Sequence, residues 1–193
     1  MSGSRAELLE RLSHDLRTPL ASLRGYLDTL LLKDASLATE ERRRFLQIAA
    51  RQSEHLSELL ADLLELARLD SPEFRIQIEA VQLAELAQDL VQERAASARG
   101  ILLILEASGR IPMVRADIAL MERGLRRLIQ SAAGDRVVLA LGCNADRVTV
   151  ALTCRQVARD DIVERILELH GSPLIMETFP ERGTRLSFSL PIA

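Results

Sequence analysis

The sequence predicts an α+β protein in two parts: a helical hairpin over residues 1–72 that forms a dimeric four-helix bundle, and a reduced α/β sandwich over residues 73–193. Leucines spaced by threes and fours dominate as far as Leu69, and short mixed elements follow from Phe74. Aromatic residues make up 3% of the chain and Trp is absent, so Leu, Ile, Val and Ala must build the core. This composition favours helices and weighs against an aromatic platform for nucleic-acid bases.

The hairpin is predicted from two stretches of helical periodicity joined by a short loop at residues 33–36. The seam positions are Leu9, Leu12, Leu16, Leu20, Leu23, Leu27 and Leu30 in the first helix, and Phe45, Ala49, Gln52, Leu56, Leu59, Leu63 and Leu66 in the second. Residues 39–42 supply a cap and an acidic first turn, and residues 70–72 end the second helix. A lone hairpin cannot cover both apolar faces, so we expect a homodimer. The alternative is that the hairpin packs against the rest of its own chain.

The second part alternates short strand and helix patterns. Strands are predicted over residues 74–78, 101–105, 136–141, 147–153, 174–179 and 184–190, and helices over residues 83–98, 117–133 and 160–169. Asp117 is a good N-cap for the middle helix. Turn residues 142–146 and 181–183 join two strand pairs into hairpins. Helices gathered on one face of a mixed sheet make an α/β sandwich.

Charge and cysteine content exclude several classes of protein. The formal net charge of −3 argues against a nucleic-acid binder. Cys143 and Cys154 are too few for a disulfide framework or a complete zinc site, and both lie in apolar stretches. We therefore expect two small buried side chains, no metal site and a cytoplasmic location. No apolar run approaches the roughly 18 residues of a membrane span, so we expect no direct membrane contact.

Residues 13–20 carry the most specific pattern, Ser-His-Asp-Leu-Arg-Thr-Pro-Leu. His14 falls between two seam leucines, so its side chain is expected to point toward water. An exposed imidazole beside the carboxylate of Asp15 can act as a nucleophile, with the carboxylate stabilising its positive charge. Thr18 lies one turn further on the same face, where its hydroxyl can position a water. His14, Asp15 and Thr18 are therefore the candidate catalytic residues.

This string resembles the phosphoacceptor box of bacterial sensor histidine kinases and matches it without a mismatch. Residues 62–70 also resemble the dimerisation domain of that family. The resemblance implies that His14 carries a phosphoryl group and that Asp15 assists as acid or base. It also implies that Thr18 assists hydrolysis of the phosphoryl group on a partner protein.

The second part resembles the ATP-binding domain of the same family, with the nucleotide-holding residues replaced. Arg127 and Ser131 stand where the family has two asparagines, and a serine is a poor substitute for the Mg²⁺-ligating amide. The strand over residues 147–153 runs on toward a helix where the family has an Asp-x-Gly-x-Gly box, which leaves no residues for an ATP lid. Residues 159–161, Arg-Asp-Asp, replace a phosphate-binding Gly-x-Gly. Glycine lets a backbone approach phosphate closely, whereas acidic side chains repel it.

A phosphoacceptor histidine without a nucleotide site resembles the kinase-like histidine phosphotransferases of phosphorelays. That resemblance implies transfer through His14 to and from the aspartates of response-regulator receiver domains. No cofactor is expected on this chain, because the receiver domain supplies the Mg²⁺. Arg17, Ala21 and Arg24 are the expected docking residues.

Two other functions remain open. One is a kinase core with ATP-dependent autophosphorylation, which nucleotide binding would reveal. The other is a non-catalytic pseudokinase that regulates another kinase, which would accept no phosphoryl group from a regulator. His55 and His170 are expected to be structural in every case, because His55 flanks a seam leucine and His170 ends a helix before Gly171.

Overall fold

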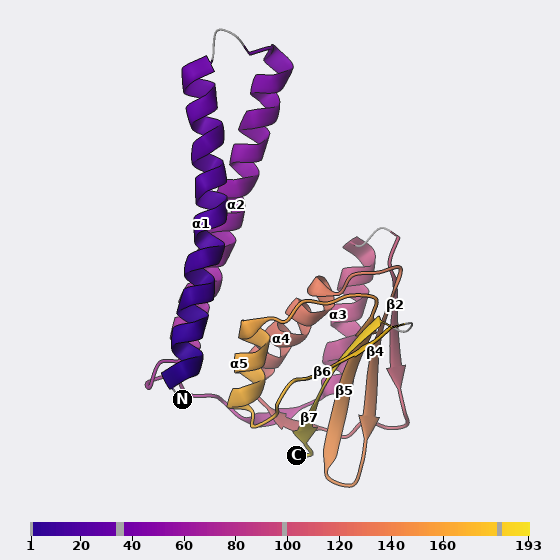
Figure 1. The fold of residues 1–193 in the computed structure, drawn as a ribbon. Coiled ribbons are helices and arrows are strands. Elements are labelled where there is room, and N and C mark those ends of the chain that lie inside the picture. The colour runs from indigo at the N-terminus through magenta and orange to yellow at the C-terminus, as the bar shows by residue number, and fades with distance from the viewer. Residues whose placement is uncertain (1, 34–36, 98–99, 181–182) are drawn as a thin grey trace. The chain divides into compact units, whose positions relative to one another are not determined.

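A computed structural model describes the backbone of residues 2–33, 37–97, 100–180 and 183–193. Within these ranges, the side chains of residues 2–14, 33 and 97 are outside the description. The chain divides into two compact units, Met1–Arg68 and Leu69–Ala193 (Figure 1). The first unit is the helical hairpin, and the second is an α/β layer structure.

The hairpin consists of α1 (Ser2–Lys33) and α2 (Thr39–Leu69). The rings of Tyr26 on α1 and Phe45 on α2 lie 5.4 Å apart between centroids, which joins the two helices near the loop. At the start of α2, Glu41 Oε2 accepts the backbone N–H of Ala38 at 3.0 Å, which is half of a capping box. This hydrogen bond places the cap at Ala38, one residue before the predicted capping segment at residues 39–42.

The seam of α2 lies largely between the two helices of one chain, since Ala49 and Leu66 are buried. A second row of apolar residues on α2 faces outward: Leu46, Leu60 and Leu64 are 52%, 52% and 63% exposed. The predicted seam of α2 is thus mainly an intrachain contact. The leucines beside it are the ones that the single hairpin leaves uncovered.

The second unit is built on a five-stranded sheet with the order β2-β4-β5-β7-β6. Its strands are β2 (Leu102–Ala107), β4 (Arg136–Cys143), β5 (Arg147–Cys154), β6 (Ile175–Phe179) and β7 (Gly183–Pro191). β2 pairs in parallel with β4, and the other pairs are antiparallel. Two shorter strands, β1 (Glu79–Val81) and β3 (Val114–Ala116), form a separate antiparallel ladder.

Three helices cover one face of this sheet: α3 (Leu83–Ser97), α4 (Ile118–Ser131) and α5 (Asp161–Leu169) (Figure 1). Buried residues alternate along β4, as a strand with one covered face requires. Leu125 and Ile129 of α4 and Ile166 of α5 belong to the core that fills the space between the layers. These layers confirm the predicted α+β architecture, a helical hairpin followed by a sandwich.

The predicted strand over residues 74–78 is wrong. Those residues are outside any strand, and ladder pairing begins only at Glu79, opposite Ala116. The reason is a side chain from elsewhere in the chain, because Asp117 Oδ2 accepts the backbone N–H of Gln77 at 2.9 Å. The other carboxylate oxygen of Asp117 accepts the N–H of Leu120 at 3.1 Å, which confirms Asp117 as the N-cap of α4.

Two further expectations concern cysteines and membranes. Cys154 is buried as predicted, and burial raises the pKa of its thiol. Cys143 is exposed at the end of β4, so the prediction that both cysteines are buried is wrong for this one. Among the helices that the structure describes, none is long and apolar enough to cross a membrane.

Candidate functional site

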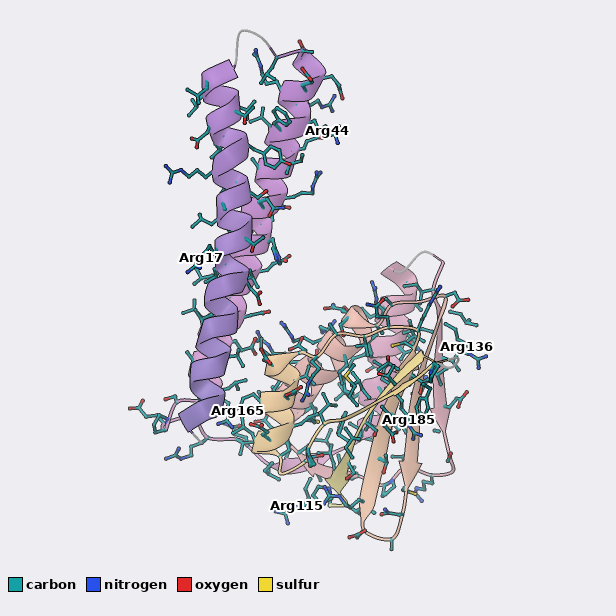
Figure 2. The ribbon with its side chains drawn as sticks, in the orientation of Figure 1. Arg17, Arg44, Arg115, Arg136, Arg165 and Arg185 are labelled. Atoms are coloured by element: carbon teal, nitrogen blue, oxygen red, sulfur yellow. The ribbon has the colours of Figure 1, made fainter. Side chains whose placement is uncertain are left out.

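The string at residues 13–20 lies within α1, which continues as one helix through Pro19. At about 100° per residue, helix geometry places residues 14, 17, 18 and 21 along one stripe. The side chain of His14 lies outside the described residues, so only its backbone is placed. Arg17, Thr18 and Ala21 of this stripe are exposed, and Arg17 projects from α1 (Figure 2).

The two other predicted residues of this region lie beside the stripe. Asp15 is exposed and follows His14 directly, about 100° round the helix. Arg24 Nε lies 3.7 Å from Asp28 Oδ2, and the Arg24 side chain is 83% exposed. Exposed ion pairs of this kind contribute little to stability. Arg24 is therefore held only weakly.

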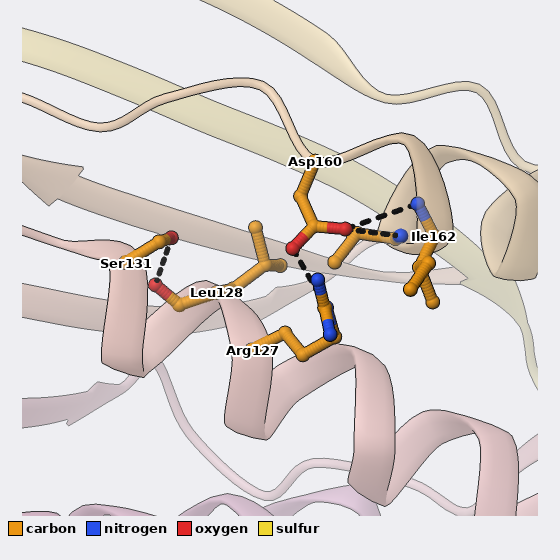
Figure 3. A network of polar contacts seen from close by, with 6 residues as sticks. Arg127, Leu128, Ser131, Asp160 and Ile162 are labelled. Carbon is orange, nitrogen blue, oxygen red and sulfur yellow. Dashed lines mark hydrogen bonds and ion pairs between the residues drawn. The ribbon is translucent and has the colours of Figure 1, made fainter. Parts of the chain in front are cut away.

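In the second unit, the structure joins two residues that the sequence flagged separately. Arg127 on α4 donates from Nε to Asp160 Oδ2, just before α5, at 2.7 Å (Figure 3). The Arg127 side chain is 26% exposed and that of Asp160 is 14% exposed, so solvent screens this ion pair only in part. Arg127 and Asp160 are 33 residues apart in sequence, and no local pattern indicates their contact.

The same carboxylate also closes the start of α5. Asp160 Oδ1 accepts the backbone N–H groups of Ile162 and Val163, at 3.0 and 3.2 Å (Figure 3). A helix N-terminus binds anions through its unpaired N–H groups, and here Asp160 already satisfies two of them. Ser131 turns back on its own helix and donates to the carbonyl of Leu128 at 3.1 Å.

The link between β5 and α5 is short and tied down. β5 ends at Cys154 and α5 begins at Asp161, so six residues join them. Ala133 and Gln156 exchange two backbone hydrogen bonds, of 2.8 and 3.1 Å, which fasten this link to the end of α4. These two bonds near its start and the Asp160 cap at its end hold the six-residue link in place.

The two histidines with described side chains differ in environment. His170 Nε2 accepts the backbone N–H of Asp117 at 3.0 Å, and Nδ1 lies 2.7 Å from the carbonyl of Ile166. Burial lowers the pKa of His170, so the ring is neutral with its proton on Nδ1. Both ring nitrogens are thus engaged. His55 is exposed on α2, with Nδ1 3.8 Å from Glu58 Oε2.

No group of three or more His, Cys, Asp or Glu side chains among the described residues could hold a metal ion. Receiver domains, in contrast, bind Mg²⁺ themselves in the transfer chemistry expected above.

Comparison with known proteins places this geometry in a family. Residues 4–72 match the His Kinase A (phospho-acceptor) domain, a range that includes the whole string at residues 13–20. The sensor protein DivL of Caulobacter vibrioides is 28% identical across 96% of this chain, in an alignment that covers 28% of DivL. The His Kinase A match and these similarities support the two-component sensor histidine kinase family for this chain. Another relative, the circadian input-output histidine kinase CikA of Synechococcus elongatus, is 29% identical over 68% of this chain and 18% of CikA.

Solved histidine kinases share the fold. The histidine kinase ThkA, solved in complex with the response regulator TrrA, superposes with a TM-score of 0.75 at 17% identity, covering 97% of this chain and 61% of that one. The histidine kinase AdeS of Acinetobacter baumannii has a TM-score of 0.67 at 17% identity, covering 93% of this chain and 97% of that one. The chain spans only 18% to 28% of the length of the first three curated relatives that it matches.

Proposed function

We propose that this member of the sensor histidine kinase family is a histidine phosphotransfer protein that works without ATP. The observation that carries the proposal is the contact between Arg127 and Asp160. These residues stand at positions that resemblance assigns to nucleotide binding, yet they are bound to each other. Asp160 also caps α5 and presents a negative charge where a phosphate group would need unpaired N–H groups. The proposed protein therefore has the scaffold of a histidine kinase but no nucleotide site.

The proposed reaction passes a phosphoryl group between carboxylates through His14. An unprotonated imidazole nitrogen of His14 attacks the phosphorus of an aspartyl phosphate on a receiver domain. A P–N bond forms, the P–O bond to the aspartate breaks, and the carboxylate leaves with the electron pair. The ring becomes a cation, which the neighbouring carboxylate of Asp15 stabilises until it takes the proton from the other ring nitrogen. Transfer to a second receiver reverses these steps.

Hydrolysis of the aspartyl phosphate on the receiver domain is the alternative to its transfer to His14. Thr18 lies one turn beyond His14 on the exposed stripe. In this proposal the hydroxyl of Thr18 orients a water toward a phosphoryl group on the docked receiver domain. Water then takes the place of the imidazole as the attacking group, and inorganic phosphate is released. The proposal thus assigns transfer to His14 and Asp15, and assigns any phosphatase activity to Thr18.

The partner proposed for this stripe is a response-regulator receiver domain. Arg17, Ala21 and Arg24 are exposed along α1 within two to three turns of His14. Alanine lets a partner helix approach closely, and the arginines offer charged hydrogen bonds at its edges. The relative ThkA was solved in complex with a response regulator, which supports this class of partner. The proposed role also places the chain in the cytoplasm, where we expect its partners to be.

The hairpin is proposed to work as a homodimer. Leu20 and Leu27 of α1 are 57% and 42% exposed, and the outward row of α2 adds Leu60 and Leu64. Monomeric proteins rarely expose so many large apolar side chains together. A second copy packed on these leucines completes a four-helix bundle, the arrangement expected for the hairpin.

A labelling experiment with two donors tests the function. The protein is incubated with labelled Mg-ATP, and separately with a receiver domain that carries labelled phosphate. We expect label on this protein only from the receiver, and we expect calorimetry with Mg-ATP to show no binding. Label from Mg-ATP alone would identify an autokinase instead. Label from neither donor, with intact binding to the receiver, would identify a pseudokinase.

A further inference from the structure

The face of the sheet that the helices leave uncovered carries a hollow of about 820 Å³. Val138 and Ala140 of β4 and Ala151 of β5 form part of its floor. Strand alternation places Val138 and Ala140 on the side opposite the buried Val137 and Leu139, which face the helices. Ala140 pairs directly with Ala151, so small side chains meet at the centre of the face and leave the space open.

Three arginines surround one end of this hollow. Arg136 begins β4, Arg155 follows β5, and Arg185 lies near the start of β7. Pairing brings these strand ends together, since Val138 lies opposite Thr153 and Thr153 lies opposite Arg185. Arg136 and Arg185 are labelled on this sheet in Figure 2. All three arginine side chains are exposed to solvent.

These three guanidinium groups make no hydrogen bond or ion pair within the part of the chain that the structure describes. Four arginines on or next to the helices, in contrast, have carboxylate partners: Arg126, Arg127, Arg159 and Arg165. Glu106 and Asp135 also line the hollow, and Glu177 lies opposite Arg185 in the ladder. None of these carboxylates is joined to the three arginines among the described side chains, so the arginine donors are available to a ligand.

We propose that this hollow binds a small phosphate monoester. A guanidinium group offers paired N–H donors that match phosphate oxygens, and three of them match the three terminal oxygens of a monoester. The volume lies within the range of small-molecule sites and far exceeds that of phosphate alone. The phosphate therefore belongs to a larger molecule.

The residues at the other end of the hollow indicate which chemical groups the rest of that molecule carries. Glu106 lies opposite Ala140, and Ala140 is two residues along β4 from Val138. Glu106 is therefore about 7 Å along the strands from the row of paired residues that holds Arg185. A carboxylate there accepts hydrogen bonds from hydroxyl groups. A phosphorylated polyol or sugar has both features, a dianionic head for the arginines and hydroxyl groups for Glu106. This site needs neither His14 nor a receiver domain, so it is independent of the proposed phosphotransfer.

Calorimetry on the full chain tests the site with five probes: glucose 6-phosphate, inorganic phosphate, glucose, gluconate and a pentaglutamate peptide. We expect glucose 6-phosphate to bind most tightly, inorganic phosphate more weakly, and glucose not at all. Arg136→Gln and Arg185→Gln should each weaken the binding of glucose 6-phosphate by about tenfold or more, since each removes a charged hydrogen bond. The matched control is Arg115→Gln on β3, outside the hollow, which should leave binding unchanged.

Two further measurements separate a specific site from general charge attraction. Backbone amide resonances of Ala140 and Ala151 should shift on titration with glucose 6-phosphate, which locates the ligand on the floor. Arg185→Lys, which keeps the charge but loses the paired donors, should bind at an intermediate level. Thermal unfolding of each variant checks that the fold is kept.

Several results would overturn the proposal. One is the absence of glucose 6-phosphate binding at millimolar concentration. A second is tighter binding of gluconate than of glucose 6-phosphate. A third is that Arg115→Gln weakens glucose 6-phosphate binding as much as Arg136→Gln and Arg185→Gln do. Tighter binding of a pentaglutamate peptide than of glucose 6-phosphate would also overturn it, in favour of a protein partner for this face.

Discussion

Arg127 and Asp160 form an ion pair that joins two helices, with Nε 2.7 Å from Oδ2, and the second oxygen of the same carboxylate caps α5. One aspartate therefore performs two structural tasks, as the partner of an ion pair and as the cap of a helix. Its removal leaves a largely covered arginine without this partner and leaves two helix N–H groups unsatisfied.

We predict that Asp160→Ala lowers the free energy of unfolding by about 1–3 kcal/mol, the combined effect of a lost cap and a lost charged hydrogen bond. Asp160→Asn keeps a capping oxygen and loses only the charge, so it should cost less. Thermal and urea unfolding measure both changes. The control is Asp89→Ala on the exposed side of α3, expected within about 0.5 kcal/mol of the parent. Equal effects at Asp160 and Asp89 would contradict the structural role.

The environment of His170 predicts a pH dependence of stability. Burial lowers the pKa of His170 in the folded protein below its ordinary value of 6.5, so the unfolded chain binds the proton more readily. This contribution is fully present above pH 6.5 and is lost as the pH falls through the lowered pKa. A charged ring would also place an N–H against the N–H of Asp117.

Urea unfolding between pH 7.5 and pH 5 checks this prediction, with His170→Gln as the comparison. The parent should lose more stability than the variant across this range, because only the parent carries the titrating ring. Parallel curves for the two proteins would show that His170 makes no such contribution.

The exposed leucines predict a homodimer that acidic substitutions at its interface should dissociate. Leu60→Glu with Leu64→Glu places four acidic groups in the interface of the two copies. Full burial of each leucine contributes about 1.5–3 kcal/mol, so the dissociation constant should rise at least about a hundredfold. Sedimentation equilibrium measures it. Leu102→Glu on β2, 58% exposed in the second unit, is the matched control and should remain dimeric.

Asp15 and Thr18 should affect different steps. Asp15→Asn removes the charge that stabilises the histidine cation, so transfer into His14 should slow by about a hundredfold while receiver binding is kept. Thr18→Ala should leave transfer rates nearly unchanged and reduce hydrolysis of receiver phosphate, whereas Thr18→Ser should preserve both. Rapid-quench labelling and phosphate release distinguish the two steps. Equal loss of transfer in Thr18→Ala and Asp15→Asn would contradict this division.

Local patterns in the sequence were sufficient for most of the fold. Asp117 was predicted as an N-cap because its position before an apolar helical pattern is a local signal, and the structure confirms it. Leucine spacing likewise predicted both hairpin helices. It could not tell an intrachain seam from an interface between copies, because the buried Ala49 and the exposed Leu46 follow similar spacings.

Contacts between distant residues were not predictable in this way. The strand expected at residues 74–78 failed because Asp117, 40 residues away, takes the N–H of Gln77. For the candidate site, the sequence indicated that Arg127 and Asp160 were wrong for a nucleotide, but not that they bind each other. The arginines around the open face of the sheet come from β4, from β7 and from the residue after β5, and only the register brings them together.

The most direct test of the central claim is phosphoryl labelling of His14→Ala and His14→Gln by a receiver domain that carries labelled phosphate. The expected exposed position of His14 predicts that both variants keep their fold, with stability changed by less than about 0.5 kcal/mol. Neither should acquire label, whereas the control His55→Ala should label like the parent protein. Acid-labile label on the His14→Ala protein, mapping to His55, would contradict the account.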